Sequence, residues 1–472
     1  MTSLDLIALL PVLVLALGST AVLMVGAWWS SAHRFWMWVG VLLALVAAGL
    51  AWSEAAPIAE ITGMFSAGAY ARFFTGLWSL CAAATLLFSL RYGPERGFAG
   101  SEYTSLVLFA ATGMSLLSAA SSLVGIFLGL EAYTLVLYIL ISYHKGETLG
   151  AEAGLKYLVL GALSTGFLAF GIALIYTASG TFHLPQAIMA LSTPSSLRPL
   201  GMVGLAMIVV ALGFKVSLVP FHLWTPDVYQ GAPAPVAGLL STGSKGAVFA
   251  ALITLMTGTV MTGPVMGPVL WTLAAASMLV GTVCALRQDN VKRMLAYSSV
   301  VHMGYLLVAL LAGGSTGRSA VVFYLVVYAL VNLGAFGTIA SFSFPDREPQ
   351  SFDDFRGAGY HHPFRAAALT LFMLSLAGIP PTAGFIGKFG IFYAAIGSGF
   401  YGLALLGILA SLVSLYYYLR LVIVMFMSDE EAGPMRSAAG QEQLALAGAA
   451  VATLVLGLFP GPLLDFILKI VS

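Results

Sequence analysis

Residues 211–224 of this sequence read ALGFKVSLVPFHLW, an apolar run that contains Lys215 and, five residues later, Pro220. A proline inside a helix removes a backbone hydrogen bond and breaks or kinks the helix. At membrane depth, irregular backbone is tolerated only where it is buried in protein or lines a wet cavity. The stretch therefore predicts a broken membrane helix whose lysine faces water or a polar channel.

Residues 376–389 read LAGIPPTAGFIGKF and form a second interruption of the same kind, with Pro380, Pro381 and Lys388. The two interruptions fall in the seventh and the twelfth of the membrane helices that we expect. The two interrupted helices are five apart in the chain. Because five is an odd number, the segment from the fourth to the eighth helix and the segment from the ninth to the thirteenth have opposite orientations in the membrane. Broken helices at matching places in two halves are typical of inverted-repeat transporters. We therefore predict two inverted five-helix repeats.

The composition places this architecture in a lipid bilayer. Only 8% of the 472 residues are charged and 60% are hydrophobic, whereas about 25% of the residues of a soluble domain are charged. Apolar stretches of about 20 residues, the length that crosses a bilayer, recur from end to end. We predict an all-α integral membrane protein of about fourteen helices, one polytopic domain over 1–472. Its expected parts are 1–100 (helices 1–3), 101–260 (first repeat, helices 4–8), 261–428 (second repeat, helices 9–13) and 429–472 (helix 14).

The distribution of Lys and Arg predicts the orientation of the chain. The odd-numbered loops carry Arg34, Arg91, Arg96, Lys145, Arg287, Lys292, Arg293, Arg347, Arg356, Arg365 and Arg436. The termini and the even-numbered loops carry Arg72, Arg198, Arg318 and Lys469. Because cytoplasmic loops hold the Lys and Arg excess, we expect the odd-numbered loops in the cytoplasm and both termini outside.

Some classes of function are disfavoured by the same composition. Cys81 and Cys284 are far apart and form no paired motif, which argues against a disulfide framework, a zinc site or an iron–sulfur cluster. The net charge is only +1, so the chain lacks the excess of positive charge that is typical of nucleic-acid-binding proteins. We expect no cofactor in this chain and no nucleic-acid partner.

Charged residues inside the apolar runs are the candidate functional groups. Glu131 lies in IFLGLEAYTLVLY, where a carboxylate costs a few kcal/mol and is by default functional and paired with a cation. The alternative is a glutamate that only packs helices together. Lys215 and Lys388 lie beside the two breaks. Lys245 follows Ser241, Thr242 and Ser244, whose hydroxyls can support a water chain, although the lysine could instead reach a nearby membrane interface.

Three further residues carry a weaker signal. Lys156 follows a polar loop, so that snorkelling to the interface and a functional role are both open. His222 lies in the first break, and His302 lies about two turns into a predicted helix. Histidine titrates near neutrality and can relay a proton, but a structural role is open for both.

These side chains suit protons better than metal ions. The sequence holds no ring of carboxylates for a metal cation, and buried lysines repel one. A carboxylate and an ammonium at roughly 6 Å attract by about 3 kcal/mol at an effective dielectric constant near 20. Moving one charge against 100 mV takes about 2.3 kcal/mol. Forming and breaking such a pair can therefore load and release a proton against a membrane potential.

Four stretches carry a resemblance to a known family. They are 215–235 (KVSLVPFHLWTPDVYQGAPAP), 241–245, 287–305 and 374–389, and they resemble the antiporter-like membrane subunits of respiratory complex I over essentially the whole chain. The compact length and Lys388 resemble the N type. The resemblance implies fourteen helices with two inverted five-helix repeats. It also implies that Glu131 and Lys215 form a signal-responsive pair, that Lys245 is the central relay, and that Lys388 exchanges protons with the outside.

The resemblance further implies a proton-translocating subunit of NADH-quinone oxidoreductase in the bacterial cytoplasmic (inner) membrane. NADH, FMN, iron–sulfur clusters and quinone would bind to partner subunits, so that this chain alone oxidises nothing. Its partners would be other membrane subunits, the hydrophilic redox arm through them, and the lipid bilayer. The alternatives are a subunit of a multisubunit cation/proton antiporter, or of a membrane-bound hydrogenase or ferredoxin-coupled complex. A solute permease and a structural anchor are more distant alternatives.

Overall fold

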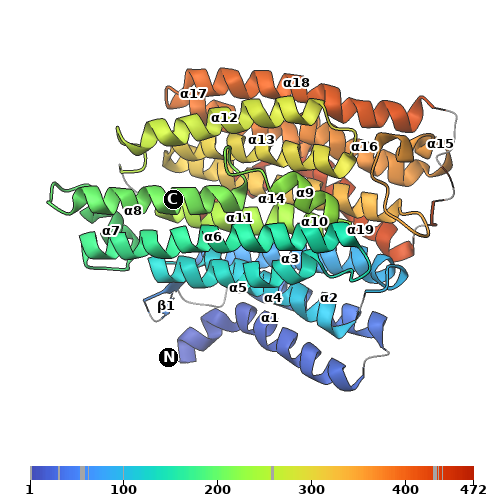
Figure 1. Ribbon diagram of the computed structural model, residues 1–472, viewed down its shortest axis with the longest axis horizontal. Helices are drawn as coiled ribbons and strands as arrows, with labels where there is room; N and C mark the ends of the chain where they lie inside the picture. Colours follow the sequence, from blue (N-terminus) through green and yellow to red (C-terminus); the bar gives the residue numbers. More distant parts are fainter. Residues whose placement is uncertain are drawn as a thin grey trace.

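Long apolar helices lie side by side along the long axis of the bundle in the computed structural model (Figure 1). The structure describes residues 3–29, 32–53, 59–61, 63–98, 100–256, 260–428, 433, 435–437 and 439–471. Within these residues, twelve helices are long and apolar enough to cross a membrane. Adding α4 and the broken pair α16–α17 gives fourteen crossing segments, which confirms the predicted all-α membrane architecture.

The first half of the chain supplies eight of these segments. They are α1 (Ser3–Trp28), α2 (His33–Trp52), α3 (Ala69–Glu95), α4 (Ser101–Ser118), α5 (Leu123–Ile141), α6 (Thr148–Ser179), the broken pair α8 (Arg198–Val216) and α9 (Thr225–Gly231), and the continuous run α10 (Ala234–Leu239), η1 (Leu240–Ser244) and α11 (Lys245–Leu255). The short α7 (Leu184–Ala190) connects α6 to α8.

The second half supplies six. They are α12 (Met266–Leu286), α13 (Val291–Ala312), α14 (Gly314–Ser341), the pair α16 (Pro363–Ala377) and α17 (Ala383–Gly397), α18 (Tyr401–Phe426) and α19 (Gly440–Leu458). A 3₁₀ turn η2 (Phe352–Phe355) and α15 (Ala358–His361) lie between α14 and α16, and α20 (Gly461–Val471) packs against α14.

One element departs from the expected all-helical chain. The strands β1 (Ala59–Ile61) and β2 (Phe65–Ala67) form a small antiparallel hairpin between α2 and α3. The Ser66 N–H extends it by donating to the Ala119 carbonyl at the end of α4. Strands of three residues leave too short an alternation for a sequence pattern to reveal them.

The breaks fall in the seventh and twelfth crossing segments, as predicted, and both end their first helix in the same way. At the end of α8, Ser217 is left-handed (φ 67°) and the Leu218 N–H donates to the Gly213 carbonyl at 2.8 Å. At the end of α16, Gly378 is left-handed (φ 85°) and the Ile379 N–H donates to the Leu374 carbonyl at 3.0 Å. Both are Schellman motifs, which satisfy the last carbonyls of a helix.

Each motif is followed by a cis proline, at Val219–Pro220 and at Pro380–Pro381. The chain then turns into the second short helix of each pair, α9 or α17. The two breaks therefore share one backbone design, although their side chains differ.

Burial separates the interior helices from the outer ones. The apolar windows of α10–α11, α13 and α14 are 100%, 94% and 89% buried, whereas those of α1 and α19 are 28% and 22% buried. A helix that is apolar and buried all round lies in the core of a bundle. Polar side chains in the interior of these helices, such as Lys245, His302 and Asn332, are consequently shielded from lipid.

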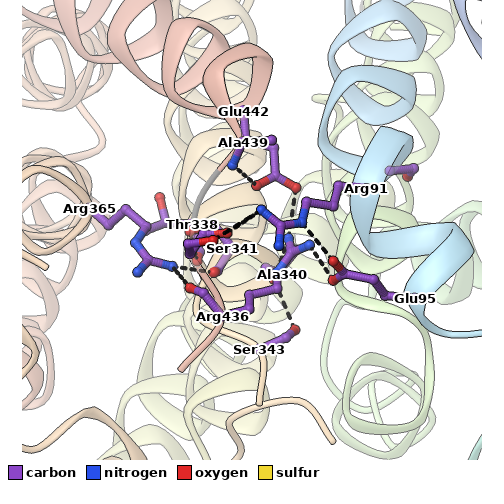
Figure 2. A network of polar contacts seen from close by, with 12 residues as sticks. Arg91, Glu95, Thr338, Ala340, Ser341, Ser343, Arg365, Arg436, Ala439 and Glu442 are labelled. Atoms are coloured by element: carbon purple, nitrogen blue, oxygen red, sulfur yellow. Dashed lines mark hydrogen bonds and ion pairs between the residues drawn. The ribbon is translucent and has the colours of Figure 1, made fainter. Parts of the chain in front are cut away.

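The end of α14 is held by a buried charge network (Figure 2). Arg436 pairs with Glu95 of α3 at 2.8 Å and with Glu442 of α19 at 2.7 Å, and it also donates to the Ala340 carbonyl at 3.1 Å. Arg365 of α16 donates to the Ser341 carbonyl. Cations at a helix C-terminus oppose its partial negative charge, so the network fastens α3, α16 and α19 to α14.

The expected division of the chain into parts stays a prediction. The proposed boundary at 100/101 coincides with the start of α4 at Ser101. The boundary at 428/429 lies at the edge of the described residues, because 429–432 lie outside them.

Candidate functional site

Lys215 lies in the last turn of α8 and is 1% exposed. Its Nζ lies 5.8 Å from the ring centroid of Tyr138, 6.0 Å from that of Tyr157 and 5.9 Å from that of Phe214. Within the described residues, this Nζ has no hydrogen-bond partner. Ring faces attract a cation, but they do not replace the hydrogen bonds that a buried ammonium loses with water.

Glu131 of α5 is the carboxylate that acts electrostatically on Lys215. It is half-buried and accepts a hydrogen bond from the Thr165 hydroxyl of α6 at 2.7 Å. The structure thus brings the predicted pair together without a hydrogen bond between them, since the Lys215 ammonium is unbonded among the described residues.

Lys245 is fully buried at the point where η1 passes into α11. Its Nζ donates to the Ser299 hydroxyl of α13 at 2.6 Å and lies 5.2 Å from the Tyr229 ring centroid and 5.9 Å from that of Trp224. Full burial contradicts the alternative that this lysine reaches a membrane interface. The π-helical turn before it, a feature frequent at functional sites, was not predicted.

Aromatic rings connect the surroundings of Lys215 to those of Lys245. The rings of Tyr138 and Tyr157 are 5.1 Å apart, and those of Tyr157 and Trp224 are 4.7 Å apart. The hydroxyls of Tyr138, Tyr157 and Ser244 are buried and unbonded among the described residues. Buried polar groups of this kind are the usual partners of internal water.

His302 of α13 contacts side chains of two further helices. Its ring nitrogens contact the hydroxyls of Tyr324 (α14) and Tyr418 (α18), the latter at 3.0 Å. Its ring lies 5.3 Å from that of Tyr328. The Asn332 side chain donates to the Tyr328 hydroxyl at 2.9 Å and to a serine hydroxyl of η1 at 2.7 Å. Hydrogen bonds therefore run from the π-helical turn to Tyr328, whose ring lies beside that of His302.

Lys388 of α17 closes the series. Its Nζ donates to the Ala377 carbonyl at 3.0 Å and to the Ser411 hydroxyl at 2.8 Å. It also lies 5.3 Å from the ring centroid of Tyr305, whose ring is 5.5 Å from that of His302. The ammonium borders a cavity of about 410 Å³ between α17 and α18.

The other two weaker candidates take different positions. His222 lies in the first break, with its ring 6.3 Å from that of Tyr297. Lys156 is paired with Glu152 and with Asp227, each at 2.7 Å, and its side chain is 41% exposed. Exposed ion pairs contribute little to stability. Because Lys156 is paired with carboxylates at the surface, it does not belong with the buried Lys215, Lys245, His302 and Lys388.

Side-chain contacts link the surroundings of Lys215, Lys245, His302 and Lys388 into one series, and Glu131 lies at the Lys215 end of it. Sequence reasoning missed the uncharged residues that join them: Tyr138, Tyr157, Thr165, Ser299, Tyr305 and Asn332. Asn332 had a signal, because a side-chain amide inside an apolar run needs partners. Lysines can donate and hydroxyls can both donate and accept, so such a line can pass protons.

Comparisons with known proteins show the family of this chain. A family model described as "NADH:quinone oxidoreductase/Mrp antiporter, TM" matches residues 120–414. The chain is 48% identical to NADH-quinone oxidoreductase subunit N of Syntrophotalea carbinolica, over 97% of each chain, and 46% identical to that of Geotalea uraniireducens, over 99% of each. It superimposes on a chain of respiratory complex I from Thermus thermophilus with a TM-score of 0.82 and 35% identity, covering 96% of this chain and 98% of the other.

Proposed function

The chain belongs to the NADH:quinone oxidoreductase/Mrp antiporter family as a membrane subunit of the N type, and from that membership we propose that its buried lysines and one glutamate carry protons. It is a proton-translocating subunit of NADH-quinone oxidoreductase, and it spans the membrane many times. Its partners are the other membrane subunits of the complex and, through them, the hydrophilic arm.

One observation carries the proposal. Lys215, Lys245 and Lys388 are 1%, 0% and 4% exposed, and hydroxyls or aromatic rings occupy the space between them. Charges at such depth are costly and mark ion or proton pathways. The line has a carboxylate at one end and a cavity at the other.

The resemblance to the family suggests a role for each group. Glu131 and Lys215 form the pair that responds to events at the quinone end of the complex. An approach of the carboxylate stabilises the protonated lysine, and its retreat favours release of the proton. Lys245 passes the proton through Ser299 toward His302, and Lys388 exchanges it with the outside at the cavity.

We leave two candidates outside this path. Lys156 is neutralised by Glu152 and Asp227 at the surface of the chain. His222 interacts electrostatically with Lys245, but no described hydrogen bond joins the two.

The orientation and the repeats belong to the same proposal. We place both termini outside and the odd-numbered loops in the cytoplasm, on the strength of their Lys and Arg excess. The two Schellman motifs followed by proline support two inverted repeats. We place NADH, FMN, iron–sulfur clusters and quinone on partner subunits, because two isolated cysteines cannot supply the four ligands of a cluster.

Replacement of Lys215 by alanine tests the proposal. The whole complex carrying Lys215→Ala is reconstituted into liposomes, and NADH-driven acidification is followed with a pH-sensitive dye. We expect proton pumping to be abolished while the complex still assembles. The matched control is Lys145→Ala, which removes an exposed loop lysine and should pump normally. Full proton translocation by Lys215→Ala would contradict the proposal.

The alternative functions receive no comparable support. Relatives that are 48%, 46% and 43% identical to the chain are named as subunit N of NADH-quinone oxidoreductase, not as antiporter or hydrogenase subunits.

A further inference from the structure

Besides the pair between Arg436 and Glu442, the structure holds another buried ion pair, which lies outside the proposed proton path. Lys292, the second residue of α13, pairs with Glu348 of the loop between α14 and η2, and their side chains are 1% and 11% exposed. The same ammonium donates to the Ala232 carbonyl at 2.7 Å. Neither residue belongs to the groups that the proton path uses.

The Glu348 carboxylate is saturated with donors. One oxygen accepts from Lys292, and the other accepts from the Tyr92 hydroxyl of α3 and from the Ala234 N–H at 2.8 Å. Burial by itself raises the pKa of Glu348, but the Lys292 ammonium and these hydrogen bonds hold the pKa below its ordinary value. The carboxylate is therefore ionised at neutral pH.

The pair joins the two elements that carry the centre of the proton line. Ala232 and Ala234 flank the joint between α9 and α10, and α10 continues through η1 to Lys245. Along α13, Ser299 follows Lys292 by seven residues, about 10 Å of helix. One ion pair thus contacts the start of the run α10–η1–α11 and the start of α13. The same two segments meet again where Lys245 donates to Ser299 at 2.6 Å.

Stability alone does not account for such a pair. A buried ion pair is often no more stabilising than apolar residues of the same volume, because desolvation offsets the attraction. What apolar residues cannot supply are the directed bonds to the Ala232 carbonyl and the Ala234 N–H. These bonds specify where α10 begins relative to α13.

We infer that Glu348 is a positioning residue for proton translocation, which acts by holding α10 and α13 so that Lys245 stays hydrogen-bonded to Ser299. The inference rests on the proposed role of Lys245. It assigns a function to a loop that lies outside the membrane-crossing segments.

The main test is Glu348→Gln in the whole reconstituted complex. The amide can keep an acceptor toward Tyr92 and Ala234, but it then turns an N–H toward Lys292, and the buried ammonium loses its counter-charge. We expect the pumping rate per assembled complex to fall at least fivefold, with the KM for quinone unchanged within twofold. The matched control is Asp353→Asn, whose carboxylate lies five residues further on, in η2, and is 71% exposed, and we expect it to pump normally.

A double variant separates positioning from stability. Lys292→Met with Glu348→Leu removes both buried charges, so the yield and thermal midpoint of the complex should recover. Pumping should stay at least fivefold reduced, because the bonds to Ala232 and Ala234 are still missing. Recovery of pumping in the double variant, or wild-type pumping by Glu348→Gln, would overturn the inference.

Two more variants make the result decisive. If Glu348→Gln does not assemble, Tyr92→Phe removes one donor and leaves the ion pair, and it should lower pumping two- to threefold; no change would count against the inference. Lys245→Ala tests the proposed function independently. Wild-type pumping by Lys245→Ala would remove the premise, whereas loss of pumping there beside normal pumping in Glu348→Gln would contradict the positioning role alone.

Discussion

In the first break, Lys215 stands two residues before the left-handed Ser217, whereas in the second break Lys388 stands ten residues after the left-handed Gly378. The backbones of the two breaks correspond from the Schellman motif to the proline, with Ser217 and Gly378 at the same place in their motifs, although α9 begins eight residues after Ser217 and α17 five residues after Gly378. The lysines, however, lie on opposite arms, one on α8 and the other on α17. The two halves therefore share the interruption of the helix, but not the position of the lysine relative to it.

The surroundings of the two ammonium groups differ accordingly. The Lys215 ammonium contacts three rings and is unbonded among the described residues, with Glu131 as its electrostatic partner. The Lys388 ammonium has two acceptors, Ala377 and Ser411, and a neighbouring cavity. The first ammonium therefore depends on rings and a carboxylate, whereas the second has direct hydrogen-bond acceptors and a neighbouring cavity.

The largest expected effect comes from replacing each lysine by arginine. Arginine keeps the positive charge but cannot be deprotonated in proteins. If both lysines release a proton during turnover, Lys215→Arg and Lys388→Arg should each lower NADH-driven proton pumping by at least tenfold. The measurement is dye-monitored acidification of proteoliposomes, normalised to assembled complex.

This pair of variants also tests whether the two lysines have the same function. The cavity beside Lys388 offers room for a guanidinium, whereas the rings around Lys215 do not. Wild-type pumping by Lys388→Arg would mean that Lys388 is a fixed charge. A Lys145→Arg control, in an exposed loop, should change nothing.

An intermediate effect is expected at the left-handed residues themselves. A Cβ on Gly378 would lie 2.9 Å from Cδ of Lys388 and 3.4 Å from its Nζ, at a φ of +85°. Gly378→Ala should therefore destabilise the complex by about 1–2 kcal/mol and lower pumping three- to tenfold by displacing the ammonium. Thermal unfolding and the pumping assay measure the two effects.

The matched change in the first break has the opposite sign. Ser217 already adopts φ 67°, so Ser217→Gly relieves the strain of a side chain there, and the thermal midpoint should be unchanged or higher. Its hydroxyl bond with Thr225 is lost, which limits the gain. A destabilisation as large as that of Gly378→Ala would show that the two motifs are not equivalent.

The breaks and the candidate lysines could be predicted because their signals are local. A proline or a lysine inside an apolar run is conspicuous on its own. The partners were out of reach, because Ser299 and Tyr305 meet Lys245 and Lys388 only through the packing of α13 against other helices. The π-helical turn before Lys245 likewise has no characteristic sequence by which it could be predicted.

Some charges that counted as loop residues proved to be interior ones. Lys292, Arg365 and Arg436 are 1%, 4% and 9% exposed. Sequence position near a loop shows that a cation is close to the membrane boundary, but not that it faces water. Glu348, the partner of Lys292, and Glu95, a partner of Arg436, are distant from them in the sequence, and only the fold brings them together.

The smallest expected effect concerns the carboxylate that distinguishes the first break from the second. Thr165→Val removes the hydroxyl that donates to Glu131 while keeping the shape of the side chain. A hydrogen bond to a charged group contributes about 1.5–3 kcal/mol where it is buried; Glu131 is only half-buried, so we expect pumping to fall only two- to threefold. Thr177→Val on the same helix is the matched control, because that exposed hydroxyl bonds only to the backbone of its own helix. A loss as severe as that of Lys215→Ala would mean that Thr165 conducts protons itself, and the first break would then resemble the second, where a hydroxyl (Ser411) contacts the lysine directly.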